Sequence, residues 1–198
     1  MTAPELADRL LLPVPTGAGA DAAVVLATAR WPVTGSDTLT PIAGFVLSTF
    51  SPLVAEVAER CLRARYGEPP ATREHSGSTA LVLASARGDM TTNETAQDTA
   101  EAGGRVPPLL FFQSNPNAVL GWIAARWALD GPVLSIAPTG EDPLADAQHV
   151  AGLLMADGEA AEVLVIVAEL DPDRAEAVLL GSHRKAGLIV PTAMEGQR

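Results

Sequence analysis

Hydrophobic residues occur along this chain in short runs that alternate with longer stretches in which apolar and polar positions are mixed. Runs with the length of buried strands lie at 22–28, 79–85, 133–137, 162–169, 175–181 and 186–191. Stretches with apolar residues three or four positions apart, typical of amphipathic helices, run from Ser51 to about Gly67, from Asn115 to Gly131 and from Pro143 to Asp157. Alternating strands and helices predict an α/β fold with a mixed, mostly parallel sheet and helices packed on both faces.

Two regions depart from this alternation. The last predicted strands follow one another without a helix, which predicts an antiparallel edge of the sheet. The segment from Arg87 to Pro108 is polar, contains glycine and shows no periodicity, so it is predicted to be a surface loop with room for a short helix. We expect a flexible N-terminal arm at 1–21, a single domain at 22–191 and a C-terminal tail at 192–198.

Composition narrows the function classes. The 198 residues are 47% hydrophobic and 19% charged, as in one compact domain. The net charge of −11 has the wrong sign for binding nucleic acid or an anionic membrane. The chain has no apolar run long enough to span a bilayer, an N-terminus poorly suited to a signal peptide, and one cysteine. We therefore expect a soluble cytoplasmic protein without a metal or cofactor.

A family resemblance comes from the second half of the chain. The segment from Phe111 to Pro132, FFQSNPNAVLGWIAARWALDGP, combines a Pro-Asn turn, a helix of small residues and a closing Gly-Pro. A strand, a tight turn, a helix and a buried strand then follow in VLSIAPTGEDPLADAQHVAGLLMADGEAAEVLVIVAE. In order and spacing these features resemble the N-terminal half of β-ketoacyl synthases. The resemblance covers about Val24 to Val190 and implies half of a thiolase-like fold.

The resemblance places Gly140 where ketosynthases carry their nucleophilic cysteine, and no thiol occurs between Pro138 and Asp142. Thiolate chemistry needs a sulfur at the N-terminus of the following helix, where the helix dipole lowers the thiol pKa. Glu141 and Asp142 place negative charge there instead. The catalytic histidines or asparagine of the family come from its second half. We therefore expect no condensing activity from this chain alone.

The half-fold also predicts an interface. In the complete thiolase fold the helix from Pro143 to Asp157 lies in a central layer, so its apolar stripe would need cover from another subunit or from other segments of the chain. The strand before the nucleophile turn pairs across the dimer axis in the family, and 133–137 matches it. The predicted interface residues are Val133, Leu134, Ser135, Ile136, Leu144, Ala147, Ala151 and Leu154.

The titratable candidates outside the turn have ordinary structural explanations. Cys61 lies on the apolar face of its helix, so we expect it in the core rather than as a displaced nucleophile. His149 and Glu141 are weak candidates for a general base, and for His149 we favour an exposed helix position. His75 and His183 lie in polar, turn-like sequence and are expected at the surface.

Three further groups of residues have both a functional and a structural interpretation. The candidates for an acyl pocket are Phe112, Ser114 and Asn117. Helix capping explains Asn115 or Asn117 without any ligand, and we favour capping for them. Trp122 and Trp127 are five residues apart and cannot share one helix stripe, so we expect one in the core and the other at the surface or against a partner. Glu94, Asp98 and Glu101 have helical spacing without a nearby histidine, which favours a solvated acidic face over a metal site.

These observations favour a non-catalytic, ketosynthase-like accessory subunit of polyketide or fatty-acid type biosynthesis. It would associate with a true ketosynthase, in a role like that of chain length factors. One alternative is a stand-alone homodimer that binds acyl-carrier-protein intermediates through a basic cluster such as Arg60, Arg63 and Arg65. The other is a repurposed isomerase, cyclase or hydrolase that uses His149 and the acids at 141–142.

Overall fold

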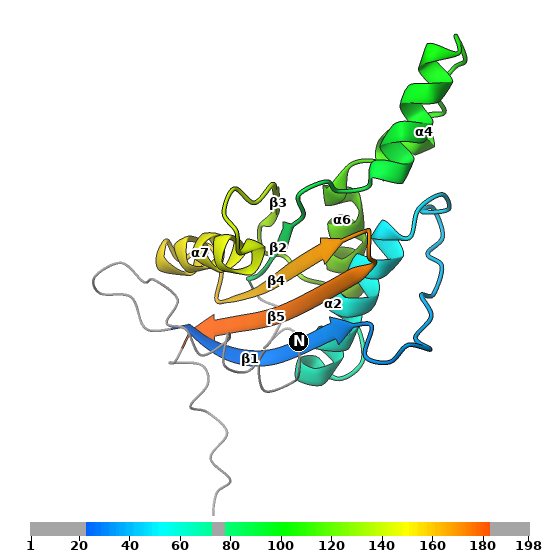
Figure 1. Cartoon of the computed structure of the whole chain (residues 1–198). Helices are drawn as coiled ribbons and strands as arrows, with labels where there is room; N and C mark the ends of the chain where they lie inside the picture. Colours follow the sequence, from blue (N-terminus) through cyan, green and yellow to red (C-terminus); the bar gives the residue numbers. More distant parts are fainter. Residues whose placement is uncertain (1–22, 73–77, 183–198) are drawn as a thin grey trace, which may run out of the picture.

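The computed structural model describes residues 23–72 and 78–182, shown in colour in Figure 1. The strands are β1 (Ala23–Trp31), β2 (Thr79–Ala84), β3 (Val133–Ile136), β4 (Glu162–Glu169) and β5 (Arg174–Ser182). The helices are α2 (Phe50–Tyr66), α4 (Met90–Glu101), α5 (Pro108–Gln113), α6 (Pro116–Trp127) and α7 (Pro143–Ala156). The predicted N-terminal arm, the predicted strand at 186–191 and the C-terminal tail lie outside the described residues.

The strands form one sheet in the order β1-β5-β4-β2-β3. Strands β3, β2 and β4 pair in parallel, and β5 pairs antiparallel with both β4 and β1. Four of the five strands therefore point the same way, which confirms the predicted mixed, mostly parallel sheet. The predicted antiparallel pairing near the end of the chain is confirmed for β4 and β5. The edge strand on that side of the described sheet is β1 rather than β5, because β1 pairs antiparallel with β5.

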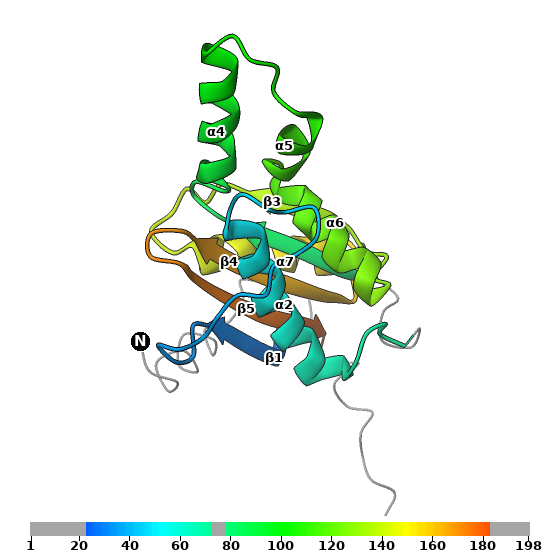
Figure 2. The same cartoon turned by 90° about the vertical axis from the view of Figure 1, so that its right-hand side faces the viewer.

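Helices cover both faces of the sheet, as predicted (Figure 2). Successive side chains of a strand point to opposite faces, so one strand serves two cores. On one face, Leu81 and Leu83 of β2 pack in the core that α2 and α6 complete. On the other face, Ala80 and Val82 pack in a second core beneath α7. All six residues of β2 are buried, which explains why this strand reads as a continuous apolar run.

Helix α2 supplies most of the helical side of the larger core. It begins at Phe50, one residue before the predicted start, and the Phe50 N–H donates to the Ser48 hydroxyl at 3.0 Å. Its buried face includes Leu53, Val57 and Cys61, as the apolar periodicity predicts. No helix in the described part of the chain is long and apolar enough to cross a membrane.

Helix α6 packs on α2 through a buried tryptophan. The Trp127 side chain is fully buried, and its indole Nε1–H donates to Glu59 Oε1 at 2.9 Å. Trp122 is partly buried, with the Arg126 guanidinium 5.6 Å from its ring centroid. The prediction that one of the two tryptophans lies in the core is therefore confirmed.

The segment 87–108, predicted as a surface loop with room for a short helix, contains the twelve-residue helix α4, which fills more of the segment than expected. The Asp89 carboxylate caps this helix by accepting the Thr92 N–H at 3.1 Å and the Thr92 hydroxyl at 2.8 Å. Thr92 is the only buried residue of α4. A helix without an apolar face gives no hydrophobic periodicity, which is why the pattern did not reveal it.

We predict that Glu59→Ala destabilises the chain by about 1–3 kcal/mol, because it leaves the buried Trp127 Nε1–H without an acceptor. The Glu59 carboxylate also accepts hydrogen bonds from Arg63 and Arg126. Urea unfolding measures the effect. The matched control is Glu56→Ala, which removes a more exposed ion pair with Arg60 and should cost less than about 1 kcal/mol. Equal losses for both variants would contradict this role of Glu59.

Candidate functional site

The turn between β3 and α7 lies at the carboxyl edge of the sheet, where ligand sites of α/β proteins commonly occur. Helix α7 begins with Pro143, and the preceding Asp142 caps it. Asp142 Oδ1 accepts the N–H groups of Leu144 at 3.1 Å and Ala145 at 3.3 Å. The predicted position of the nucleophile, Gly140, lies in this turn directly before the helix.

A second carboxylate closes the turn from the helix side. Asp146 Oδ2 accepts the backbone N–H groups of Thr139 and Gly140, each at 2.9 Å. A Cβ atom added to Gly140 would lie 3.0 Å from Asp146 Oδ1. A side chain at position 140 would therefore lie against the Asp146 carboxylate, which would have to shift by a few tenths of an ångström. The turn lacks a thiol, and the N–H groups of Thr139 and Gly140 are already paired with a negative charge.

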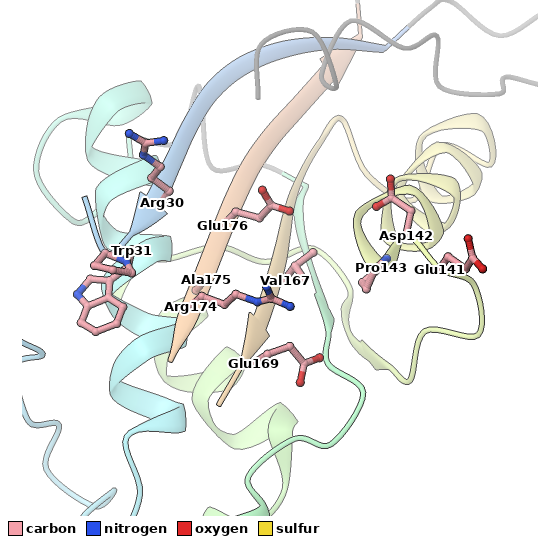
Figure 3. Close-up of a pocket in the computed structure, with 11 residues that line it drawn as sticks. Arg30, Trp31, Glu141, Asp142, Pro143, Val167, Glu169, Arg174, Ala175 and Glu176 are labelled. Atoms are coloured by element: carbon pink, nitrogen blue, oxygen red, sulfur yellow. The ribbon is translucent and has the colours of Figure 1, made fainter. Parts of the chain in front are cut away.

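A pocket of about 470 Å³ opens next to this turn (Figure 3). The last residues of β1 and β4, the first residues of β5 and the start of α7 form its walls. The lining residues are Arg30, Trp31, Pro32, Glu141, Asp142, Pro143, Val167, Glu169, Arg174, Ala175 and Glu176. None of them is a cysteine, serine or histidine, so the pocket offers charge and apolar surface but no nucleophile of these types.

The pocket charges come from strands far apart in the sequence. Arg30 of β1, Glu176 of β5 and Val167 of β4 are cross-strand neighbours in one row of the sheet. Glu169 at the end of β4 accepts the Ala86 N–H at 2.6 Å and so ties the pocket to the segment after β2. Sequence reasoning missed these residues, although charges inside the apolar runs of β1 and β5 were a signal.

Comparisons with known proteins bear on the fold. No protein-family model and no curated protein matches the chain. Among solved structures, it matches a complex of the ketosynthase ApeO with its chain length factor ApeC from Xenorhabdus doucetiae, with 16% identity, 81% of this chain and 79% of that chain covered, and a TM-score of 0.58.

Two further matches are of the same kind. The ishigamide ketosynthase/chain length factor matches with 17% identity, a TM-score of 0.59 and coverage of 74% of this chain and 47% of that chain. The AntDE:AntF structure holds a type II polyketide synthase acyl-carrier protein in complex with its ketosynthase. It matches with 12% identity, a TM-score of 0.65 and coverage of 84% of this chain and 65% of that chain. This chain has a ketosynthase-like, thiolase-type fold. The predicted fold class is thereby confirmed.

Within this ketosynthase-like fold, the other titratable candidates do not gather at the turn. Cys61 is fully buried in α2, and burial raises the pKa of its thiol to about 12, so the prediction of a core cysteine is confirmed. His149 is exposed on α7 and does not line the pocket, whereas Glu141 does. His75 and His183 lie outside the described residues.

The predicted interface divides into two parts. Val133 to Ile136 form β3, an edge strand of the described sheet. Leu144, Ala147 and Ala151 are buried in the core between α7 and the sheet of the same chain, and Leu154 packs partly buried against that core. The assignment of Leu144, Ala147 and Ala151 to a subunit interface was therefore wrong. They are not accessible to a partner, because the chain's own strands cover them.

The predicted acyl-pocket residues lie at the junction of α5 and α6, away from the residues that line the pocket described above. Phe112 is 54% exposed, the Ser114 hydroxyl donates to the Phe111 carbonyl, and Asn117 is exposed. Asn115, not Asn117, caps α6 by accepting the Asn117 N–H at 2.9 Å. Within residues 23–72 and 78–182, no group of three or more metal-ligating side chains comes together.

We predict that Gly140→Cys introduces a thiol whose pKa lies above the ordinary value near 8.5, because the Asp146 carboxylate would lie beside it. Asp146→Asn in the same variant keeps an oxygen acceptor but removes the charge, and should lower that thiol pKa by about one unit. The pH dependence of alkylation, followed by mass spectrometry of the labelled peptide, measures both values. Cys61 serves as the buried internal control. Identical pKa values in the two variants would contradict the role given to Asp146.

Proposed function

We propose that this chain is a non-catalytic, ketosynthase-like accessory subunit that associates with a true ketosynthase in polyketide or fatty-acid type biosynthesis. The observation that carries the proposal is the turn before α7. It has Gly140 in place of a thiol, and the Asp146 carboxylate occupies the two N–H groups that precede the helix. The partner supplies the thiol and the histidines, and this chain contributes interface, in a role like that of a chain length factor.

The solved structures support this proposal through the kinds of protein that they contain together. Two of the three matches described above contain a ketosynthase together with a chain length factor. The sequence identities of 12–17% establish likeness of fold, so the role itself is an inference from the vacant nucleophile position.

Strand β3 supplies a surface for pairing with the partner. The N–H groups of Leu81 and Ser85 in and after β2 donate to the carbonyls of Pro132 and Ile136. Since backbone groups of a strand alternate in direction, those of Val133 and Ser135 point away from β2. Among residues 23–72 and 78–182 no strand pairs with this side of β3, and an edge of this kind accepts a strand from another chain. We place the partner's strand there.

The alternative of a stand-alone carrier-protein binder finds less support in the charge distribution. Each arginine of the candidate basic cluster is paired with acids of the same chain: Arg60 with Asp37 and Glu56, Arg63 with Glu59 and Glu68, Arg65 with Glu162. Paired arginines offer little attraction to an acidic carrier protein. Of the base candidates for a repurposed enzyme, His149 does not line the pocket, whereas Glu141 and Asp142 do. Asp142 already accepts the two N–H groups of the α7 cap, so Glu141 is the remaining candidate and has no histidine beside it in the pocket.

We predict that the tagged chain, purified from its own host cells, has the native mass of a one-to-one complex with a full-length ketosynthase. Ser135→Pro removes an outward N–H of β3, and should weaken that complex at least tenfold while leaving the melting temperature of the isolated chain unchanged, because proline is tolerated on an outer edge. Ser135→Ala is the matched control and should bind like the wild type. Isolation of the chain only as a monomer or a homodimer would overturn the proposal.

A further inference from the structure

Helices α4 and α5 project from the body of the molecule at one end (Figures 1 and 2). We call residues 90–113 the arm. Helix α4 buries only Thr92, and α5 buries only Gln113. Short helices with so little burial gain almost nothing from tertiary packing in this chain. Threonine and asparagine occupy five of the twelve positions of α4, and both residue types have low helix propensity.

The arm exposes large apolar side chains that the described part of the chain leaves uncovered. Leu109, Phe111 and Phe112 of α5 are 48%, 79% and 54% exposed. Val46 and Leu47 in the segment after β1 are 71% and 42% exposed. We call these five residues the arm patch.

The two parts of the arm patch are held side by side. The Phe45 and Phe112 rings lie 6.2 Å apart between centroids, and the Gln113 side chain donates to the Gly44 carbonyl. Isolated exposed apolar residues are common on proteins, but two exposed phenylalanines in a segment joined in this way to a second one with exposed apolar residues are typical of a surface that meets another protein.

The charges of the arm are mostly acidic, with Arg105 as the one basic residue between positions 90 and 113. Helix α4 carries Glu94, Asp98 and Glu101 and no basic residue. Asp98 and Glu101 lie in its last turn, where the negative end of the helix dipole makes a carboxylate unfavourable. In the described part of the chain none of these three acids forms an ion pair, and Glu101 accepts only the Gln97 amide. A cation brought by another molecule would relieve this local repulsion.

We propose that the arm is a docking element for a partner protein that presents an apolar recess bordered by arginine or lysine. The arm patch fills the recess, and the acids of α4 meet the basic border. A second copy of this chain fits poorly, because a symmetric contact through the arm patch brings two acidic α4 helices together and each copy carries a net charge of −11. The inference deepens the proposed function, since it names the surface and the charge of the ketosynthase partner.

The test uses the complex isolated from the host, with the partner then purified and titrated with variants of the full chain. Phe111→Ser with Phe112→Ser should weaken binding at least a hundredfold. Glu94→Lys, Asp98→Lys and Glu101→Lys together should weaken it at least tenfold and abolish the loss of affinity that added salt causes for the wild type. Asp157→Lys with Glu159→Lys, at exposed positions after α7, is the matched control and should bind within twofold of the wild type.

The charge-reversed variant gives a second readout, its melting temperature, which should not fall when its affinity for the partner falls. Replacing acids by lysine in the last turn of α4 favours the helix dipole, so the melting temperature of the isolated variant should stay the same or rise while its affinity falls. A fall in both would mean that the arm had unfolded, and the charge part of the inference would then fail. Tighter or unchanged binding by the reversed variant would also overturn it.

The outcomes separate this inference from the proposed function. If a ketosynthase co-purifies and binds every arm variant like the wild type, the inference fails and the proposed function stands. If another protein co-purifies in equal amount and shows the predicted arm and salt dependence, the inference stands and the proposed function fails. A monomer without partner overturns both. A homodimer that Phe111→Ser with Phe112→Ser dissociates also overturns both, because the arm then binds a second copy.

Discussion

Strand β2 is buried on both faces, with alternate side chains in the α2–α6 core and in the α7 core, and this double burial fixes its place between β4 and β3. A strand in that position must pair on both sides, and the crossover helices then lie on opposite faces of the sheet. The carboxyl ends of β1, β2, β3 and β4 consequently meet at one edge. The segment with Val46, the arm, the Gly140 turn and the pocket all follow those ends.

Hydrophobic periodicity predicted the elements that contribute to the two cores, such as β2, β4 and α2, because burial imposes the pattern that the sequence displays. It missed α4, because a helix that buries one threonine has no apolar face to detect. The local signal was the cap, an aspartate at 89 three residues before the threonine at 92. Hydrophobic periodicity also did not identify β1 as an edge strand. The partner of β1 lies some 150 residues away in the sequence, and pairing over that distance leaves no local mark.

The candidate site shows the same division. The missing thiol was predictable, because a residue type at one position can be read directly from the sequence. The two hydrogen bonds that Asp146 accepts were not predictable, because an aspartate in the first turn of a helix is also explained by the helix dipole. Only the path of the turn shows that its carboxylate accepts two N–H groups of that turn. The pocket charges depend on the register of β1 against β5, which is a long-range property.

The distribution of exposed apolar surface indicates where another protein would bind. A half thiolase fold suggested that the missing cover would lie over α7, yet Leu144, Ala147 and Ala151 pack on the chain's own sheet, and Leu153 is the one large hydrophobic residue of α7 that is exposed. Exposed phenylalanine is instead concentrated in α5. Since burial of apolar surface drives association, a partner gains more free energy at the arm than over α7. The arm and the Gly140 turn both follow carboxyl ends of parallel strands, so a protein seated on the arm approaches the edge of the sheet that carries the Gly140 turn.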